Sequence, residues 1–180
     1  LAASGYAVAL APTVSFQGVP PDALTSAGVA IVPGDLQRHL SCSWINYDAV
    51  IISRPHNFER VGDVVRTYQP NAALLYDCEA LFWRRLTLQS KFVTDHAACD
   101  GLLQDATDMR ALEERIVIQC DAAVTVSKEE ATLLAGVEGC CPIRTLLPAE
   151  PAVSLGMRTF DERFGVAYVA GWQGGSGSPN

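Results

Sequence analysis

Short apolar runs alternate with longer amphipathic segments along this chain. The runs are rich in Val, Ile, Leu and Ala, as strands buried on both faces of a sheet are. The segments between them carry apolar residues at helical spacing, as Phe58, Val61 and Val65 do. This alternation predicts a parallel, doubly wound α/β sheet. The predicted strands are Tyr6–Leu10, Val29–Val32, Ala49–Ser53, Ala72–Tyr76, Ala122–Val126 and a last one after Pro142.

Prolines and polar caps mark the predicted helix ends. A proline pair before Asp22 opens a short helix, and the helix through Phe58 ends before Pro70. Residues 88–103 show no clear periodicity and are predicted to be irregular. The remaining predicted helices are Asp35–Cys42, one that begins at Glu79, and one with the apolar stripe Met109, Leu112, Ile116 and Cys120.

The junction after Ala122–Val126 carries the strongest local signal. Ser127 stands where a helix N-cap belongs, and Glu130 follows three residues later, which predicts a capping box. Gly136 is expected to close that helix. A strand that leads directly into a helix N-terminus presents N–H groups at the carboxyl edge of a sheet, where α/β proteins bind ligands.

Composition narrows the functional classes. At 180 residues the chain suits one domain that buries roughly 70% of its unfolded surface. The net charge of −7 and the presence of only two lysines argue against nonspecific nucleic-acid binding. No apolar run has the length of a membrane span, and the apolar start lacks the basic leader of a signal peptide.

The six cysteines show no metal or disulfide spacing. They are Cys42, Cys78, Cys99, Cys120, Cys140 and Cys141. Buried, reduced thiols are the expected state, which indicates a cytoplasmic protein. Asp95-His96 with Cys99-Asp100 fits no common metal site, so neither a metal nor a cofactor is predicted.

Four segments together resemble the N-terminal domain of GT-B-fold glycosyltransferases of the group-1 (GT4-like) family. They are residues 121–130 (DAAVTVSKEE), 47–56 (YDAVIISRPH), 76–85 (YDCEALFWRR), and 160–171 (FDERFGVAYVAG) with 178–180 (SPN). All four stand in the family's order and span nearly the whole chain. The resemblance implies a Rossmann-like sheet that forms the N-terminal half of a GT-B fold.

The resemblance also implies a division of labour. Residues 1–157 would form the acceptor-side domain, and 158–180 a linker with the first strand of a donor-binding C-terminal domain. The partners would be a sugar acceptor and a nucleotide-sugar donor, with transfer requiring both domains and the fragment alone inactive. Peripheral membrane contact stays open. The alternative is a non-catalytic, flavodoxin-like binding or regulatory module.

Polar residues follow three of the predicted strands, and parallel strands share their carboxyl edge. Glu79 and Asp77 are the candidate catalytic carboxylates, able to accept sugar hydroxyls or act as a base. Arg54, His56 and Ser127 are candidate substrate-binding residues. The alternatives are structural: an ion pair of Arg54 with either carboxylate, backbone satisfaction of His56, a helix cap at Asp77, and a plain N-cap at Ser127.

Two further expectations concern packing. Trp44, Phe82 and Trp83 are predicted to be interior residues rather than a sugar-stacking platform. The family's first, central strand has no counterpart before Tyr6–Leu10, which predicts a gap between that strand and Ala49–Ser53. Val166–Ala170 would fill the gap, from the same chain or from a strand-swapped dimer, or the flanking strands would close up directly.

Overall fold

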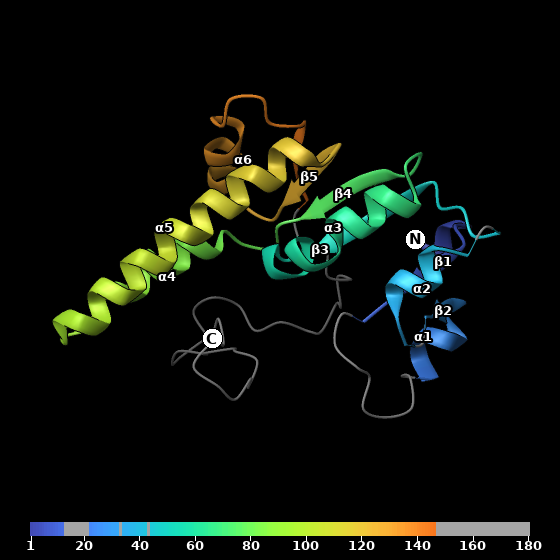
Figure 1. Ribbon diagram of the computed structural model, residues 1–180, viewed down its shortest axis with the longest axis horizontal. Helices are drawn as coiled ribbons and strands as arrows, with labels where there is room; N and C mark the ends of the chain where they lie inside the picture. Colours follow the sequence, from blue (N-terminus) through green and yellow to red (C-terminus); the bar gives the residue numbers. More distant parts are fainter. Residues whose placement is uncertain (13–21, 33, 43, 147–180) are drawn as a thin grey trace, which may run out of the picture. The chain divides into compact units, whose positions relative to one another are not determined.

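The computed structural model describes residues 1–12, 22–32, 34–42 and 44–146 of the chain (Figure 1). The predicted domain boundary after residue 157 and the gap-filling strand Val166–Ala170 lie outside the described residues.

A four-stranded parallel sheet contains four of the predicted strands in the order β3-β4-β5-β6. Ser53 lies opposite Asp77 in the register, so β3 and β4 end level with each other. The prediction of an α/β fold with parallel strands is therefore confirmed, and the arrangement is Rossmann-like. The strands are β3 (Ala49–Ser53), β4 (Ala73–Asp77), β5 (Ala122–Thr125) and β6 (Ile143–Thr145).

The first two strands form a separate parallel pair, β1 (Val8–Leu10) with β2 (Val29–Ile31). Within the described ranges β1 pairs only with β2 and β3 pairs only with β4, so the predicted interruption between them is present. The alternative that the two flanking strands close up directly is wrong for these residues. Apolar side chains of both flanking strands are exposed to solvent: Leu10 of β1 is 41% exposed and Ile51 of β3 is 51% exposed.

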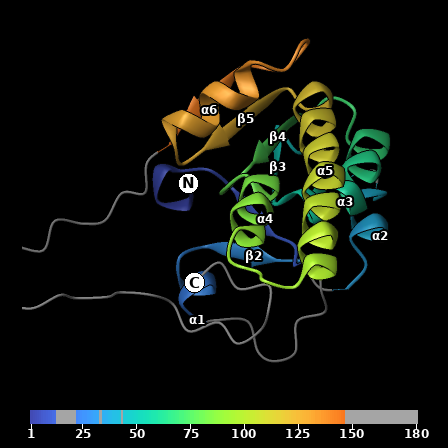
Figure 2. The same cartoon turned by 90° about the vertical axis from the view of Figure 1, so that its left-hand side faces the viewer.

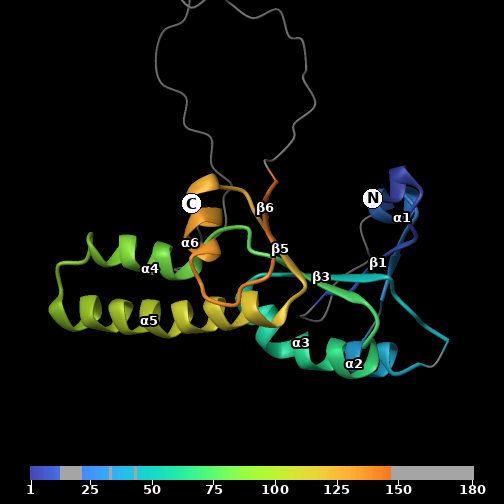
Figure 3. The ribbon, with the colours of Figure 1, turned by 90° about the horizontal axis from the view of Figure 1, so that it is seen from above.

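The helices connect and cover the strands. α3 and α5 lie side by side (Figure 2), and α4 runs alongside α5 (Figure 3). α6 packs against β5 and β6. A short 3-10 turn, η1 (Ala2–Ser4), opens the chain. The helices are α1 (Asp22–Ser26), α2 (Leu36–Leu40), α3 (Pro55–Tyr68), α4 (Phe82–Ser90), α5 (His96–Gln119) and α6 (Lys128–Ala135).

The prediction that residues 88–103 are irregular is wrong, because α4 continues to Ser90 and α5 begins at His96. Asp95 caps α5 and accepts a hydrogen bond from the Ala98 amide at 2.8 Å. The periodicity was weak for a physical reason. Between His96 and Ala111, α5 buries only Ala106 of its described residues, so no broad apolar stripe marks it.

The core centres on β4 and the C-terminal half of α5. Tyr76 and Ile116 are both 0% exposed, and the Tyr76 ring stands edge to face with Phe58 at 5.8 Å. Full burial of a large apolar side chain contributes roughly 1.5–3 kcal/mol. Gly62 makes room for Phe58, since a Cβ there would lie 2.8 Å from a ring carbon. The carboxyl end of β4 therefore lies directly beside this buried core.

Candidate functional site

The carboxyl ends of β3 and β4 bring together three predicted site residues, Arg54, Asp77 and Glu79. Ser53 Oγ donates to Asp77 Oδ2 at 2.8 Å, and the Arg54 amide donates to the Asp77 carbonyl at 3.1 Å. The ladder therefore continues one residue beyond β3. This fixes the backbone from which the Arg54 side chain departs.

Arg54 and Glu79 form an ion pair across the two strand ends, with Nε 3.0 Å from Oε2. Their side chains are 52% and 44% exposed, so the pair faces solvent. Both residues have positive φ, 73° for Arg54 and 51° for Glu79, and no other non-glycine residue does so in the described part of the chain. Such conformations cost on the order of 1–3 kcal/mol each and concentrate at functional sites.

Asp77 supports this turn from below. Asp77 Oδ1 accepts a hydrogen bond from the Glu79 amide at 3.3 Å, while Asp77 Oδ2 accepts the one from Ser53. The alternative that Asp77 caps the following helix is wrong, because α4 begins later, with Leu81 at its N-cap. The expectation that this helix starts at Glu79 is wrong as well. Glu79 lies in the turn before it, where its side chain reaches solvent.

His56 stands in the first turn of α3, directly after Pro55, and is exposed. Its ring lies edge to face with Phe82, the first residue of α4, at 5.3 Å between centroids. The Arg85 guanidinium lies 4.7 Å from the centre of the same Phe82 ring. An imidazole, an aromatic ring and a cation thus adjoin the N-terminus of α4.

The three aromatic residues expected in the interior behave differently. Trp83 packs against the core, with the Arg110 guanidinium 5.2 Å from its ring centre. Phe82 is half-buried beside His56. Trp44 is 80% exposed, so the prediction of a packing role is wrong for this residue. It lies in the turn before β3, where no described element covers it.

Ser127 caps α6 as predicted. Its Oγ accepts from the Glu130 amide at 3.4 Å and donates to Glu129 Oε2 at 2.7 Å, a contact that lowers the pKa of Glu129. In the described part of the structure, no hydrogen bond or ion pair joins Ser127 to Arg54 or Glu79. Ser127 is therefore a separate group at the end of β5.

The second half of the predicted capping box is wrong. The Glu130 carboxylate does not return to the Ser127 amide but accepts from the Leu81 amide at 3.2 Å and from Thr125 Oγ1 at 3.1 Å. The Ser127 amide instead donates to Thr125 Oγ1 at 3.4 Å. Gly136 ends α6 as expected, although its φ of −77° is right-handed. Glu130 thus links α6 to the start of α4.

Glu113 is a buried carboxylate that was not predicted from the sequence. It is 0% exposed, on α5, and accepts from the amides of Phe82 and Trp83 at 3.1 and 3.2 Å. Burial raises its pKa to about 7, against the opposing effect of these two amides. A signal was present, because Glu113 follows Met109 at helical spacing on the apolar stripe of α5.

Two buried groups adjoin this carboxylate. Burial raises the pKa values of Tyr76 and Cys78 far above their ordinary range, with the nearby Glu113 charge acting in the same direction. Cys78 is 0% exposed, so it cannot serve as a nucleophile for an external substrate. The Tyr76 hydroxyl has no hydrogen-bond partner among the residues that the structure describes.

Over the described ranges, no cluster of three or more His, Cys, Asp and Glu side chains is arranged to hold a metal ion. The same ranges contain no helix with both the length and the hydropathy of a membrane-spanning segment. No protein-family model, curated protein or solved structure matches the chain. Any function of the strand-end site must therefore be inferred from its own residues and geometry.

Proposed function

We propose that this chain is the acceptor-side domain of a GT-B glycosyltransferase, which transfers a sugar from a nucleotide-sugar donor to an acceptor. Two features support the proposal: the four ordered segments that resemble the group-1 family, and a parallel sheet whose polar strand ends meet at one edge. Ligands of open α/β sheets bind at that edge.

The Arg54–Glu79 pair carries the proposal. Its backbone is strained and its side chains are exposed, although an exposed ion pair contributes little to stability, about 0–1 kcal/mol. Strain that stability does not explain is expected where geometry serves binding or catalysis. The pair therefore belongs to the acceptor cleft in this proposal.

Each residue has a distinct role. Glu79 accepts a hydrogen bond, and then the proton, from the attacking acceptor hydroxyl, while Asp77 holds the Glu79 amide in place. Arg54 contacts Glu79 through Nε, and a guanidinium has further N–H donors for a sugar hydroxyl or a phosphate. His56 lies beside Phe82 and would contact the acceptor, with Ser127 at the adjoining strand end.

The donor is expected to bind mainly outside this domain. Calorimetric titration of the chain with UDP-, GDP- and dTDP-sugars should give no dissociation constant below ~1 mM, about −4 kcal/mol. Micromolar affinity would contradict the assignment of the acceptor side to this chain.

The role of the site is tested by measuring transferase activity in a protein that joins this chain to a donor-binding domain. Release of nucleoside diphosphate from a donor panel measures transfer. Glu79→Gln should lower turnover by 100-fold or more, as loss of a general base does, with little change in thermal stability. Glu114→Gln is the matched control, because Glu114 forms a comparable exposed pair with Arg110 at 2.7 Å. Equal turnover in the two variants would contradict the role of Glu79.

The competing hypothesis of a non-catalytic, flavodoxin-like module makes a different prediction. It expects no transfer with any donor in any domain context, and unchanged binding of its own ligand in the Glu79→Gln variant. The same assay therefore distinguishes the two.

A further inference from the structure

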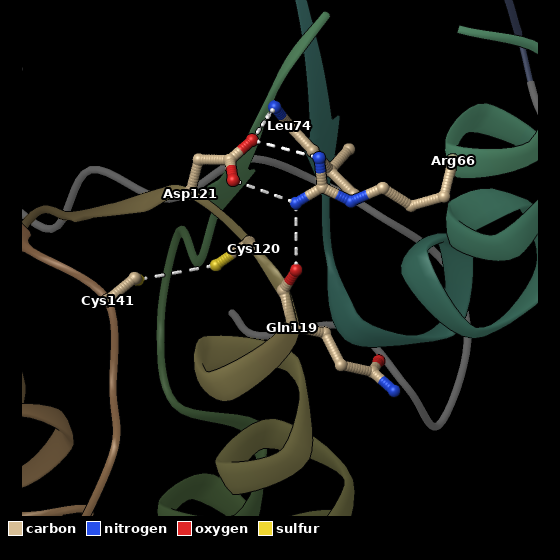
Figure 4. Close-up of polar contacts among 6 residues, drawn as sticks. All are labelled: Arg66, Leu74, Gln119, Cys120, Asp121 and Cys141. Atoms are coloured by element: carbon tan, nitrogen blue, oxygen red, sulfur yellow. Dashed lines mark hydrogen bonds and ion pairs between the residues drawn. The ribbon is translucent and has the colours of Figure 1, made fainter. Parts of the chain in front are cut away.

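Two cysteines from distant parts of the sequence meet where α5 ends. Cys120 is the C-cap of α5, and Cys141 precedes the start of β6. Their sulfur atoms lie 3.4 Å apart and point toward each other (Figure 4). Both are free thiols. The separation along the chain is 21 residues, so this proximity is a product of the tertiary structure.

Backbone hydrogen bonds hold both cysteines against the last turn of α5. The Cys120 amide donates to the Ile116 carbonyl at 3.0 Å, and the Cys141 amide donates to the neighbouring Val117 carbonyl at 2.7 Å. On the other side, the Ala123 amide donates to the Pro142 carbonyl at 3.0 Å. The two sulfur atoms are therefore attached to backbone that cannot move apart without breaking the sheet or the helix end.

Arg66 fixes the residues on either side of Cys120 (Figure 4). Its guanidinium donates to both carboxylate oxygens of Asp121 at 3.0 Å and to the Gln119 carbonyl at 2.9 Å. Asp121 in turn accepts from the Leu74 amide of β4 at 2.7 Å. A planar guanidinium in such a bidentate contact sets direction as well as distance. The contacts of Arg66 with Gln119 and Asp121 therefore fix the backbone on both sides of Cys120, whose sulfur faces Cys141.

We propose that Cys120 and Cys141 form a redox-active dithiol that a small-molecule disulfide oxidises to an intrachain disulfide. The Cys141 thiolate attacks one sulfur of the small disulfide and releases one small thiol. The Cys120 thiolate then attacks the mixed disulfide at the Cys141 sulfur and releases the second. Two protein thiols and one small disulfide thus become one protein disulfide and two small thiols.

Cys141 is the entry point because it is the more accessible of the two. Cys120 is only 6% exposed, whereas Cys141 is half-buried. Burial raises the pKa of both thiols, so little thiolate exists near neutral pH and the exchange is slow there. Because the thiolate is the reactive species, the rate should rise about tenfold per pH unit below those pKa values.

Cys140 is the other cysteine that could pair with Cys120, since it precedes Cys141 in the chain. Its sulfur, however, lies 3.8 Å from the Ala135 carbonyl, at the end of α6. Bonding between adjacent cysteines would also be strained. The geometry therefore selects Cys141 over Cys140 as the partner of Cys120.

Peptide mapping tests this selection. The reduced chain is incubated with glutathione disulfide at pH 9, where more thiolate is present, until its thiol content stops falling. It is then blocked with iodoacetamide, digested with trypsin and analysed by mass spectrometry. Cleavage after lysine and arginine yields residues 116–128, with Cys120, and residues 129–144, with Cys140 and Cys141. These two peptides should appear joined, and dithiothreitol should separate them. Their absence as a joined species while the chain stays folded would overturn the proposal.

Variants identify the bonded sulfur. Cys140→Ser should keep the joined peptides, and Cys141→Ser should lose them. Joined peptides in Cys141→Ser, at the rate seen for the unmodified chain, would show that Cys140 is the partner and refute the assignment. Repeating the oxidation in concentrated urea should abolish the preference between Cys140 and Cys141, because only the folded chain imposes it.

A thermal readout is independent of mass spectrometry. The disulfide would close the segment that contains β5 and α6, so the oxidised chain should melt on the order of 5 °C higher than the reduced chain. Cys120→Ala, with a folded circular dichroism spectrum, should show no such rise after the same treatment. An equal rise in Cys120→Ala would overturn the proposal.

Discussion

Two pairs of carboxylates lie around the end of β4, and their surroundings give them opposite roles. Asp77 and Glu79 stand on the strand end itself, with the Glu79 side chain 44% exposed in a strained turn. Glu113 and Glu130 come from α5 and α6, are 0% and 9% exposed, and cap the first amides of α4. The exposed Glu79 side chain contributes little to stability, whereas Asp77 holds Ser53 and the Glu79 amide in the turn. The buried pair holds three elements together.

This difference shows that location at a strand end and importance for folding are separate properties. A buried carboxylate that satisfies two amides is costly to remove, because the amides lose their partners in a dry environment. An exposed carboxylate can be changed at little cost to stability, so its retention of a strained backbone points to ligand chemistry. Substitution of the buried carboxylates should therefore lower stability, whereas substitution of the exposed carboxylate should lower activity with little change in stability.

The largest effect is expected from Glu113→Ala. It leaves the Phe82 and Trp83 amides without their acceptor and opens a cavity beside Tyr76, so the free energy of unfolding should fall by about 3 kcal/mol. Urea denaturation measures the change. Glu114→Ala, at the next position and with a half-exposed side chain, is the control and should cost under about 0.5 kcal/mol. Similar losses in both would remove the contrast between the two environments.

A pH series should reveal the raised pKa of Glu113. Its folded pKa of about 7 exceeds the ordinary 4.5, so its stabilisation is complete below pH 4.5 and is lost as pH rises through 7. From pH 4.5 to 8, the stability of the unmodified chain should fall by about 3 kcal/mol relative to Glu113→Gln, since one pKa unit is about 1.4 kcal/mol.

That comparison isolates one group from its neighbours. Glu130 nearby raises the pKa of Glu113 and Arg85 lowers it, while the Tyr76 and Cys78 groups stay neutral over this range because burial raises their pKa values. Glu113→Gln keeps these neighbours in place, so the difference in stability between the two proteins reports the protonation of Glu113. A difference that does not vary with pH would mean that Glu113 is ionised throughout.

An intermediate effect is expected at Arg66, whose contacts are bidentate but one-third exposed. Arg66→Met should lower the free energy of unfolding by about 1 kcal/mol, because it frees Asp121 and the Gln119 carbonyl together. Arg115→Met is the control, since Arg115 meets Glu59 through one 3.5 Å contact between exposed side chains. The control should be near neutral, and a loss at Arg115 equal to that at Arg66 would contradict the ranking.

The smallest effect on stability is expected at Glu79. Glycine adopts positive φ without strain, so Glu79→Gly should be at least as stable as the unmodified chain and about 1 kcal/mol more stable than Glu79→Ala. Melting temperatures test this order. Glu79→Ala as stable as Glu79→Gly would show that the backbone there is unstrained, and would remove the main support for a functional site.

Much of the fold was predictable from local pattern. Ala49–Ser53 is a strand with the predicted bounds, Ser127 caps its helix as expected, and α3 ends before Pro70 as predicted. These features depend on residues a few positions apart, which periodicity and capping rules describe well. The first half of α5 was missed because it buries too little to carry a periodic signal.

The candidate site was predictable as a set of residues but not as a set of contacts. The sequence indicated that Arg54, Asp77 and Glu79 would share an edge, since parallel strands end together. It left open which carboxylate pairs with Arg54, and the positive φ values at both partners were not foreseen. Whether Ser127 acts with them stays a prediction.

By itself, the sequence determined the alternation of strands and helices, the parallel α/β class and the polar ends of the strands, because each follows from neighbouring residues. Only the tertiary structure decided that Glu130 serves α4 rather than its own helix, that Glu113 is buried, and that Cys120 faces Cys141. Each of these pairings joins residues 21 or more positions apart. Their partners are set by how the elements pack, which no local pattern encodes.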